Sequence, residues 1–191
     1  MKILVVDTET TGLEGCPRDL VLEVAAVEAD TSEGAVRPVY SQVVGYDVDA
    51  WSPGLGDSWV FRHSDLTLAE VSGGKPLREA AEEARALLDG RECTSYNVAF
   101  DFGRFLSRPP WGVRPRLCPD VMLRASRLVE GDHMFGGGSA SWPKLSKAYA
   151  ALCPGDPGGI GRRQRHRALE DAAMAAHVLL ALDSMGEYMP Q

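Results

Sequence analysis

Residues 2–12 read KILVVDTETTG, an apolar run that leads into two acidic residues and a threonine-glycine turn. The β-branched and leucine-rich part, Lys2–Asp7, predicts a short central strand that is buried. Side chains two positions apart on a strand point to the same face, so we expect Asp7 and Glu9 to project together. Like charges placed in this way repel unless a cation lies between them. Alone, such a pair is also compatible with an ordinary exposed turn.

The rest of the chain alternates short strands with helices and contains no internal repeat or linker. We expect further strands over 21–28, 36–45, 92–96 and 117–121, and irregular or exposed loops over 47–60, 131–141 and 154–165. Apolar periodicity and proline positions predict helices over 63–71, 77–88, 100–106, 121–128, 143–152 and 168–182. Three strands followed by alternating helices and strands indicate an α/β fold with a mixed sheet, in one domain over residues 1–191.

Composition indicates a soluble globular protein. The chain has 191 residues, of which 45% are hydrophobic and 25% charged, and this composition excludes collagen-like, coiled-coil and wholly disordered chains. The longest apolar stretch near the N-terminus is Ile3–Val6, too short for a signal peptide or a membrane span. The four cysteines are widely spaced without a CxxC pair, which favours free thiols over a zinc or disulfide framework. We therefore expect a cytoplasmic protein without a membrane partner.

Charge is distributed unevenly along the chain. The net charge is −7, with −10 in residues 1–100 and +3 in residues 101–191. Six of the later basic residues flank a glycine-rich loop: Lys144, Lys147, Arg162, Arg163, Arg165 and Arg167. A solvated loop is one interpretation of this cluster. A local phosphate-binding rim is the other, because such a rim needs a patch of positive charge and not a basic protein.

Two further segments place acidic residues beside elements of the predicted fold. Asn97-Val-Ala-Phe-Asp101 follows an expected strand, where asparagine suits a helix N-cap and aspartate the first turn. His166-Arg-Ala-Leu-Glu-Asp171 precedes the closing helix. Five residues correspond to about 140° around a helix, so His166 and Asp171 share no face if both are helical. We therefore expect His166 on a loop just before the helix, where it is free to lie over Asp171.

The three segments resemble, in the same order, the three motifs of the DEDD (DnaQ-like) 3′–5′ exonuclease superfamily. The histidine five positions before the last aspartate, with Arg167 and not a tyrosine four before it, is similar to the DEDDh branch. His63-Ser-Asp-Leu-Thr resembles the HGI segment of the family, with Ser64 in place of glycine and an inserted acidic residue. The resemblance implies a ribonuclease H-like fold, with a mixed five-stranded sheet flanked by helices.

The resemblance also implies two divalent metal ions, Mg²⁺ or Mn²⁺, held by Asp7, Glu9, Asp101 and Asp171. Two such ions activate a water, relieve charge on the phosphoryl oxygens and stabilise the leaving oxygen, and carboxylates suit them better than they suit zinc. His166, whose ordinary pKa is about 6.5, would take the proton from the water.

Contacts with the nucleic acid are implied less directly. Thr10 and nearby backbone would hold the terminal 3′-hydroxyl, Leu13 would wedge against the last base, and His63 would lie near the terminal nucleotide. The expected substrate-binding set is Thr8, Thr10, Thr11, Gly12, Leu13, His63, Asn97 and His166. The four tryptophans at positions 51, 59, 111 and 142 are candidates for stacking on bases, although a tryptophan more often belongs to the core or a rim.

The preferred function is a metal-dependent 3′–5′ exonuclease that releases 5′-mononucleotides from single-stranded or frayed DNA ends. RNA is the first alternative substrate, although Thr10 stands where oligoribonuclease-like relatives have methionine, and contacts with the 2′-hydroxyl would decide the sugar. A nucleic-acid-binding module without catalysis is the second alternative, which the intact set of acids and His166 opposes. Association with a polymerase has no support in the sequence.

Overall fold

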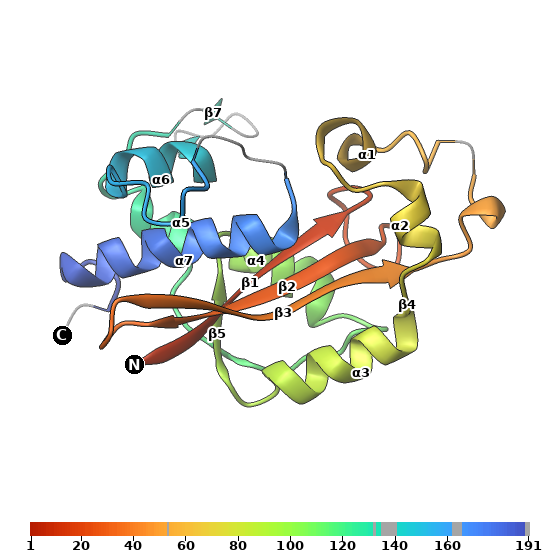
Figure 1. Cartoon of the computed structure of the whole chain (residues 1–191), viewed down its shortest axis with the longest axis horizontal. Coiled ribbons are helices and arrows are strands. Elements are labelled where there is room, and N and C mark those ends of the chain that lie inside the picture. The colour runs from red at the N-terminus through yellow and green to blue at the C-terminus, as the bar shows by residue number, and fades with distance from the viewer. Residues whose placement is uncertain (53, 132, 135–140, 162–165, 190–191) are drawn as a thin grey trace.

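The computed structural model describes residues 1–52, 54–131, 133–134, 141–161 and 166–189 (Figure 1). Its centre is a mixed sheet in the order β4-β3-β2-β1-β5-β6. β2 pairs antiparallel with both β1 and β3, whereas the β1–β5, β5–β6 and β3–β4 pairs are parallel. The strands are β1 (Lys2–Thr10), β2 (Val21–Asp30), β3 (Ala35–Gly45), β4 (Lys75–Pro76), β5 (Glu92–Ser95) and β6 (Arg116–Leu117).

Helices cover both faces of the sheet. Figure 1 shows α7, with α5 and α6 beside it, across one face, and α3 across the other. The helices are η1 (Val48–Ala50), α1 (Trp59–His63), α2 (Leu68–Ser72), α3 (Leu77–Leu88), α4 (Val98–Phe100), the π-helix η2 (Asp101–Leu106), α5 (Val121–Ala125), α6 (Leu145–Leu152) and α7 (Ala168–Ser184). A separate antiparallel pair joins β7 (His133–Met134) to β8 (Ser141–Trp142).

Alternation along β1 decides which face each side chain meets. Ile3 and Val5 are fully buried in the core that includes α7, and Leu4 and Val6 are buried in the core that includes α3 and η2. Full burial of a side chain of this size contributes roughly 1.5–3 kcal/mol, so the register of β1 is strongly fixed. Continuing the alternation, Asp7 and Glu9 fall on the α7 side, and Thr8 falls on the opposite side.

Alanines allow α7 to lie close to the sheet. Ala172, Ala175 and Ala176 are almost completely buried on this helix, which contacts β1, β2 and β3. The close packing matters for the site because it holds the first turn of α7 against the end of β1.

Among the described residues, no helix is both long enough and apolar enough to cross a membrane.

The structure confirms the α/β fold with a mixed sheet flanked by helices, but the sheet has six strands and not five. The additional strand is β4, which pairs Lys75 and Pro76 with the end of β3. A strand of two residues is too short to show an alternation of polar and apolar side chains, so the sequence pattern does not predict it. The four cysteines are free, as the spacing predicts.

Several element boundaries differ from the prediction. The expected helix over 63–71 is wrong: α1 and α2 are separate helices, and Thr67 begins the second with a capping box to Glu70. The strand expected over 117–121 is only β6, because Pro119 follows and has no N–H for the ladder. The helix expected over 121–128 ends at Ala125. The loops expected over 47–60 and 131–141 contain η1, β7 and β8, and residues 132, 135–140 and 162–165 lie outside the described residues.

Candidate active site

Three carboxylates from two distant parts of the chain meet at the end of β1. Asp7 and Glu9 come from β1, and Asp171 comes from the first turn of α7. One oxygen from each lies within 4.8 Å of the others, with Glu9 and Asp171 buried and Asp7 partly buried. The arrangement follows from the alternation along β1, because the face that carries Asp7 and Glu9 is the face that α7 covers.

The cluster is electrostatically unfavourable when no cation is present. Burial, followed by the negative charges of Asp101 and Asp171, raises the pKa of Asp7 well above its ordinary value. Burial together with the charges of Asp171 and Glu23 raises the pKa of Glu9 to about 9. A carboxylate is stabilised by an opposite charge within a few ångströms. A buried group of oxygen donors that resist ionisation therefore fits a hard divalent cation such as Mg²⁺ or Mn²⁺.

Asp101 approaches from the other face of the sheet. It begins η2, is buried, and accepts a hydrogen bond of 2.7 Å from the hydroxyl of Thr8. Burial raises the pKa of Asp101 to about 7, and the bond from Thr8 opposes this shift. Asp101 is not part of the group of three whose oxygens lie within 4.8 Å, although its charge affects both Asp7 and Glu9.

His166 lies on the segment just before α7, with a left-handed backbone (φ 50°). Its Nδ1 is 3.8 Å from Oδ2 of Asp171, which is an ion-pair distance but longer than a good hydrogen bond. The nearby carboxylate of Asp171 raises the pKa of His166, while partial burial opposes the shift. The imidazole is therefore turned inward over the carboxylate cluster.

Arg167 holds the start of α7 to two other elements. Its guanidinium donates two hydrogen bonds, of 2.9 and 3.0 Å, to Glu23 of β2 and one of 3.1 Å to Glu70 of α2. Glu23 is only 3% exposed and also accepts a bond of 3.2 Å from the N–H of Ala168, so it caps α7. Because Glu23 pairs directly with Glu9 across the sheet, Arg167 neutralises a fifth carboxylate that would otherwise face the cluster.

The sequence predictions include neither Glu23 nor this structural role of Arg167 beside the carboxylates. A readable signal existed for Glu23, since it is the single charged residue in the apolar run Val21–Val27. The sequence groups Arg167 with the basic residues that would form a phosphate-binding rim, whereas its guanidinium pairs with Glu23 and Glu70 within the protein. Arg162, Arg163 and Arg165 lie outside the described residues, and Lys144 and Lys147 remain an untested part of that prediction.

The turn after β1 uses its threonine hydroxyls internally. Thr10 donates to the carbonyl of Gly12 at 2.8 Å, and Thr11 accepts from the N–H of Leu20 at 3.0 Å. Asp19 accepts from the backbone N–H groups of Glu14 and Gly15, and its carboxylate lies where a side chain at Gly12 would begin. These contacts explain the need for glycine at position 12 and build a rigid wall beside Glu9.

This wall borders a hollow of about 410 Å³ that opens next to the carboxylates. Its lining combines the β1 turn with two aromatic side chains: Thr8, Glu9, Thr10, Thr11, Gly12, Leu13, Trp59 and Phe100. Five residues of the predicted substrate-binding set therefore share one cavity. Leu13 is 66% exposed there, as a side chain that contacts a ligand would be.

Two other residues of the predicted set contact residues that line this cavity. His63 is exposed on α1 and stacks on Trp59, and Asn97 caps α4 by accepting a bond of 3.2 Å from the N–H of Phe100. Of the tryptophans, Trp111 is buried in the core, and Trp51 packs against Tyr46 and Phe61.

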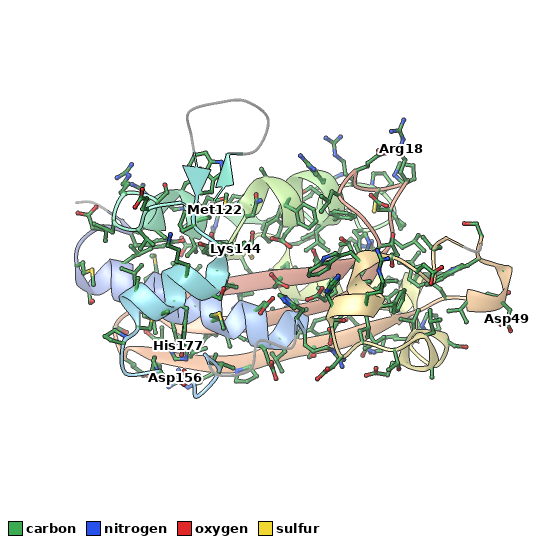
Figure 2. The ribbon with its side chains drawn as sticks, turned by 90° about the horizontal axis from the view of Figure 1, so that it is seen from above. Arg18, Asp49, Met122, Lys144, Asp156 and His177 are labelled. Carbon is green, nitrogen blue, oxygen red and sulfur yellow. The ribbon has the colours of Figure 1, made fainter. Side chains whose placement is uncertain are left out.

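The fourth histidine, His177, lies elsewhere on α7. Figure 2 shows His177 beside Asp156, at the opposite side of the molecule from Arg18, which lies on the loop after β1. The ring of His177 meets the ring of Tyr149 edge-on, with centroids 6.3 Å apart, and burial lowers the pKa of His177. His177 therefore belongs to the packing of α6 against α7 and not to the carboxylate site.

A family model described as an RNase T exonuclease matches residues 4–122. That segment contains Asp7, Glu9 and Asp101 and ends before His166 and Asp171. No curated protein matches the chain in sequence.

Solved structures share the fold at low identity. A 3′-exonuclease described in the recognition of a histone mRNA stem-loop aligns with a TM-score of 0.66 and 15% identity, over 98% of this chain and 83% of that one. Exonuclease I from E. coli, in complex with a dT13 oligonucleotide, aligns with a TM-score of 0.63 and 20% identity, over 97% of this chain but only 41% of its own. The cell-death related nuclease 4 aligns with a TM-score of 0.54 and 12% identity, over 97% and 64% of the two chains.

Proposed function

Because the chain belongs to the RNase T exonuclease family of the DEDD superfamily, we propose that it is a DEDDh-type 3′–5′ exonuclease. Its substrate is the 3′ end of single-stranded or frayed DNA, and its products are 5′-mononucleotides. The observation that carries this proposal is the meeting of Asp7, Glu9 and Asp171 within 4.8 Å, with His166 turned inward beside them. A noncatalytic binding module has no need for a cluster of buried carboxylates that oppose one another.

Two divalent ions, when bound by Asp7, Glu9, Asp101 and Asp171, supply charge relief at the phosphate and a more acidic water. The chain itself contributes the general base. Nδ1 of His166 faces Asp171, which leaves Nε2 to accept the proton of the attacking water. Trp59, Leu13 and the β1 turn form the adjacent wall, against which the last nucleotide of a strand would lie.

The test is degradation of oligonucleotides labelled at the 5′ end, with DNA and RNA of the same sequence side by side. We expect stepwise shortening in Mg²⁺ or Mn²⁺, no reaction in EDTA, and faster hydrolysis of the DNA. A 3′-phosphate should block the reaction, and circular single strands should persist. Cleavage of circles would contradict an exonuclease. Faster hydrolysis of the RNA would show that RNA, and not DNA, is the preferred substrate.

A further inference from the structure

Trp59 has an unusual environment for a large apolar side chain. It is 53% exposed at the start of α1, although it lines the hollow next to the carboxylates. On the protein side, its ring stacks on His63 with centroids 4.7 Å apart and 28° between planes. It also meets the ring of His166 edge-on, with centroids 5.3 Å apart at 73°. The indole therefore connects the hollow to the proposed general base.

We infer that Trp59 is a positioning residue through which the base of the 3′-terminal nucleotide holds His166 in place. This inference rests on the proposed function, because it names how the proposed substrate acts on the site. The terminal base packs against the open part of the indole, and the indole restrains the imidazole. Hydrolysis then depends on the presence of a base at the 3′ end.

The chemistry of the hollow favours a nucleobase over other groups of a nucleic acid. One edge of the cavity is Glu9 of the metal-binding cluster, so the sugar and base next to the reacting phosphate fall inside it. The base is the only flat, weakly polar part of a nucleotide, and aromatic side chains bind bases by stacking. Leu13 and Phe100 add apolar surface to the same cavity. A volume of about 410 Å³ lies within the usual range for small-molecule sites.

The position of His166 explains why its ring needs this support. It precedes α7, so it lacks the packing that the helix gives to Asp171. Among its described neighbours, Asp171 contacts the imidazole at Nδ1, and Trp59 contacts it through the ring edge. A general base has to lie within hydrogen-bond reach of its proton, and a displacement of about 1 Å lowers the rate strongly. Loss of the indole should therefore lower kcat, in addition to any effect on substrate affinity.

The first experiment combines variants at Trp59 with a change in the substrate. Initial rates are measured for DNA with a normal 3′-terminal nucleotide and for the same strand with an abasic 3′-terminal nucleotide. For the wild type, we expect kcat/KM on the abasic end to be about tenfold lower, since stacking of a base on an aromatic ring is worth about 1–3 kcal/mol, or roughly 5- to 150-fold. Trp59→Ala should lower kcat and abolish the difference in kcat/KM between the two substrates. Trp59→Phe should restore most of kcat and most of that difference.

Leu128→Ala is the matched control, since it removes an apolar side chain of comparable exposure (48%) that does not line the hollow. It should leave both rates and their ratio unchanged. If Trp59→Ala discriminates against the abasic end as strongly as the wild type, the inference is wrong. A wild type that is active but indifferent to the abasic end overturns it as well. A wild type that degrades neither strand contradicts the proposed exonuclease instead.

The second experiment measures base contact without hydrolysis. A strand with 2-aminopurine as its 3′-terminal base is titrated with protein in EDTA, and its fluorescence reports stacking. Binding to the wild type and to Trp59→Phe should quench the fluorescence, whereas saturation with Trp59→Ala should leave it close to the free value. Equal quenching by Trp59→Ala would show that the base lies elsewhere, independently of any activity.

Discussion

The hydroxyl of Thr8 donates a hydrogen bond of 2.7 Å to the carboxylate of Asp101, a residue 93 positions later in the chain. This contact ties the even-numbered face of β1 to the start of η2. It therefore connects Asp101, on one face of the sheet, with the strand that carries Asp7 and Glu9 on the other face.

We expect Thr8→Val to weaken divalent metal binding without disturbing the fold. The valine fills the same space but donates no bond, so Asp101, whose pKa is already about 7, should become more protonated at neutral pH. A bond to a charged group is worth about 1.5–3 kcal/mol, which corresponds to roughly tenfold or more in Mn²⁺ affinity. Calorimetric titration with Mn²⁺ measures the change, and Thr31→Val, one residue beyond the far end of β2, is the control. Unchanged affinity would assign Thr8 a role outside metal binding.

The metal-free protein should lose stability as the pH rises from about 5 to about 9. The pKa of Glu9 is about 9 in the folded protein and near its ordinary value of 4.5 when unfolded. Between these values the folded state binds more protons than the unfolded state, so the free energy of unfolding decreases with pH. Thermal unfolding in EDTA should show this slope, and excess Mg²⁺ or Glu9→Gln should flatten it. A melting temperature in EDTA that is constant or rises over this range would contradict the burial of unbalanced carboxylates.

The two histidines of the C-terminal region should titrate on opposite sides of the ordinary value. Asp171 raises the pKa of His166, and burial lowers that of His177. NMR titration of the metal-free protein should therefore place His166 above 6.5 and His177 below it. Asp171→Asn should lower the value for His166 alone, and so should Mg²⁺, because a nearby cation disfavours imidazolium. An identical His166 titration in Asp171→Asn would show that the two side chains do not interact in solution.

Replacing Arg167 alone should lower the free energy of unfolding more than replacing both Arg167 and Glu23. Arg167→Met leaves Glu23 buried and charged beside the carboxylate cluster, and loss of one partner of a buried pair costs about 3 kcal/mol or more. The double variant Glu23→Gln/Arg167→Met should be more stable than Arg167→Met, since the introduced amide is neutral and its oxygen still accepts the bond from Ala168. Urea unfolding of the four proteins measures the coupling. Simple additivity would contradict the proposed charge compensation.

Catalysis should depend on the acids and on His166 in different ways. Asp7→Asn or Asp171→Asn should reduce turnover by several orders of magnitude and abolish tight metal binding, because the remaining donors cannot hold the ions. His166→Ala should lose roughly two to four orders of magnitude in kcat while metal affinity stays near the wild-type value. Metal titration and single-turnover hydrolysis separate the two cases. Wild-type turnover in His166→Ala would assign the base to another group.

Much of the site could be predicted from the sequence because it follows from strand alternation. The alternation in β1 sends Asp7 and Glu9 to one face, and the apolar closing helix had to cover a face of the sheet. The position of His166 before α7 also agrees with its spacing from Asp171. Local patterns of period two and a helix start contain this information.

The parts that could not be predicted depend on contacts between distant segments. The role of Arg167 requires Glu23 and Glu70 to lie within reach, and the role of Thr8 requires η2 to pass beneath β1. The separation of α1 from α2 is a different case, since Thr67 and Glu70 form a capping box that is visible in the sequence. That signal would have divided the single helix expected over 63–71.

The meeting of Asp171 with Asp7 and Glu9 has a consequence for biosynthesis. A ribosome synthesises β1 well before it reaches α7. Until α7 packs on the sheet, the nascent protein lacks both the last carboxylate and the histidine beside it. A chain that lacks α7, whether partly synthesised or truncated, therefore holds no assembled carboxylate cluster.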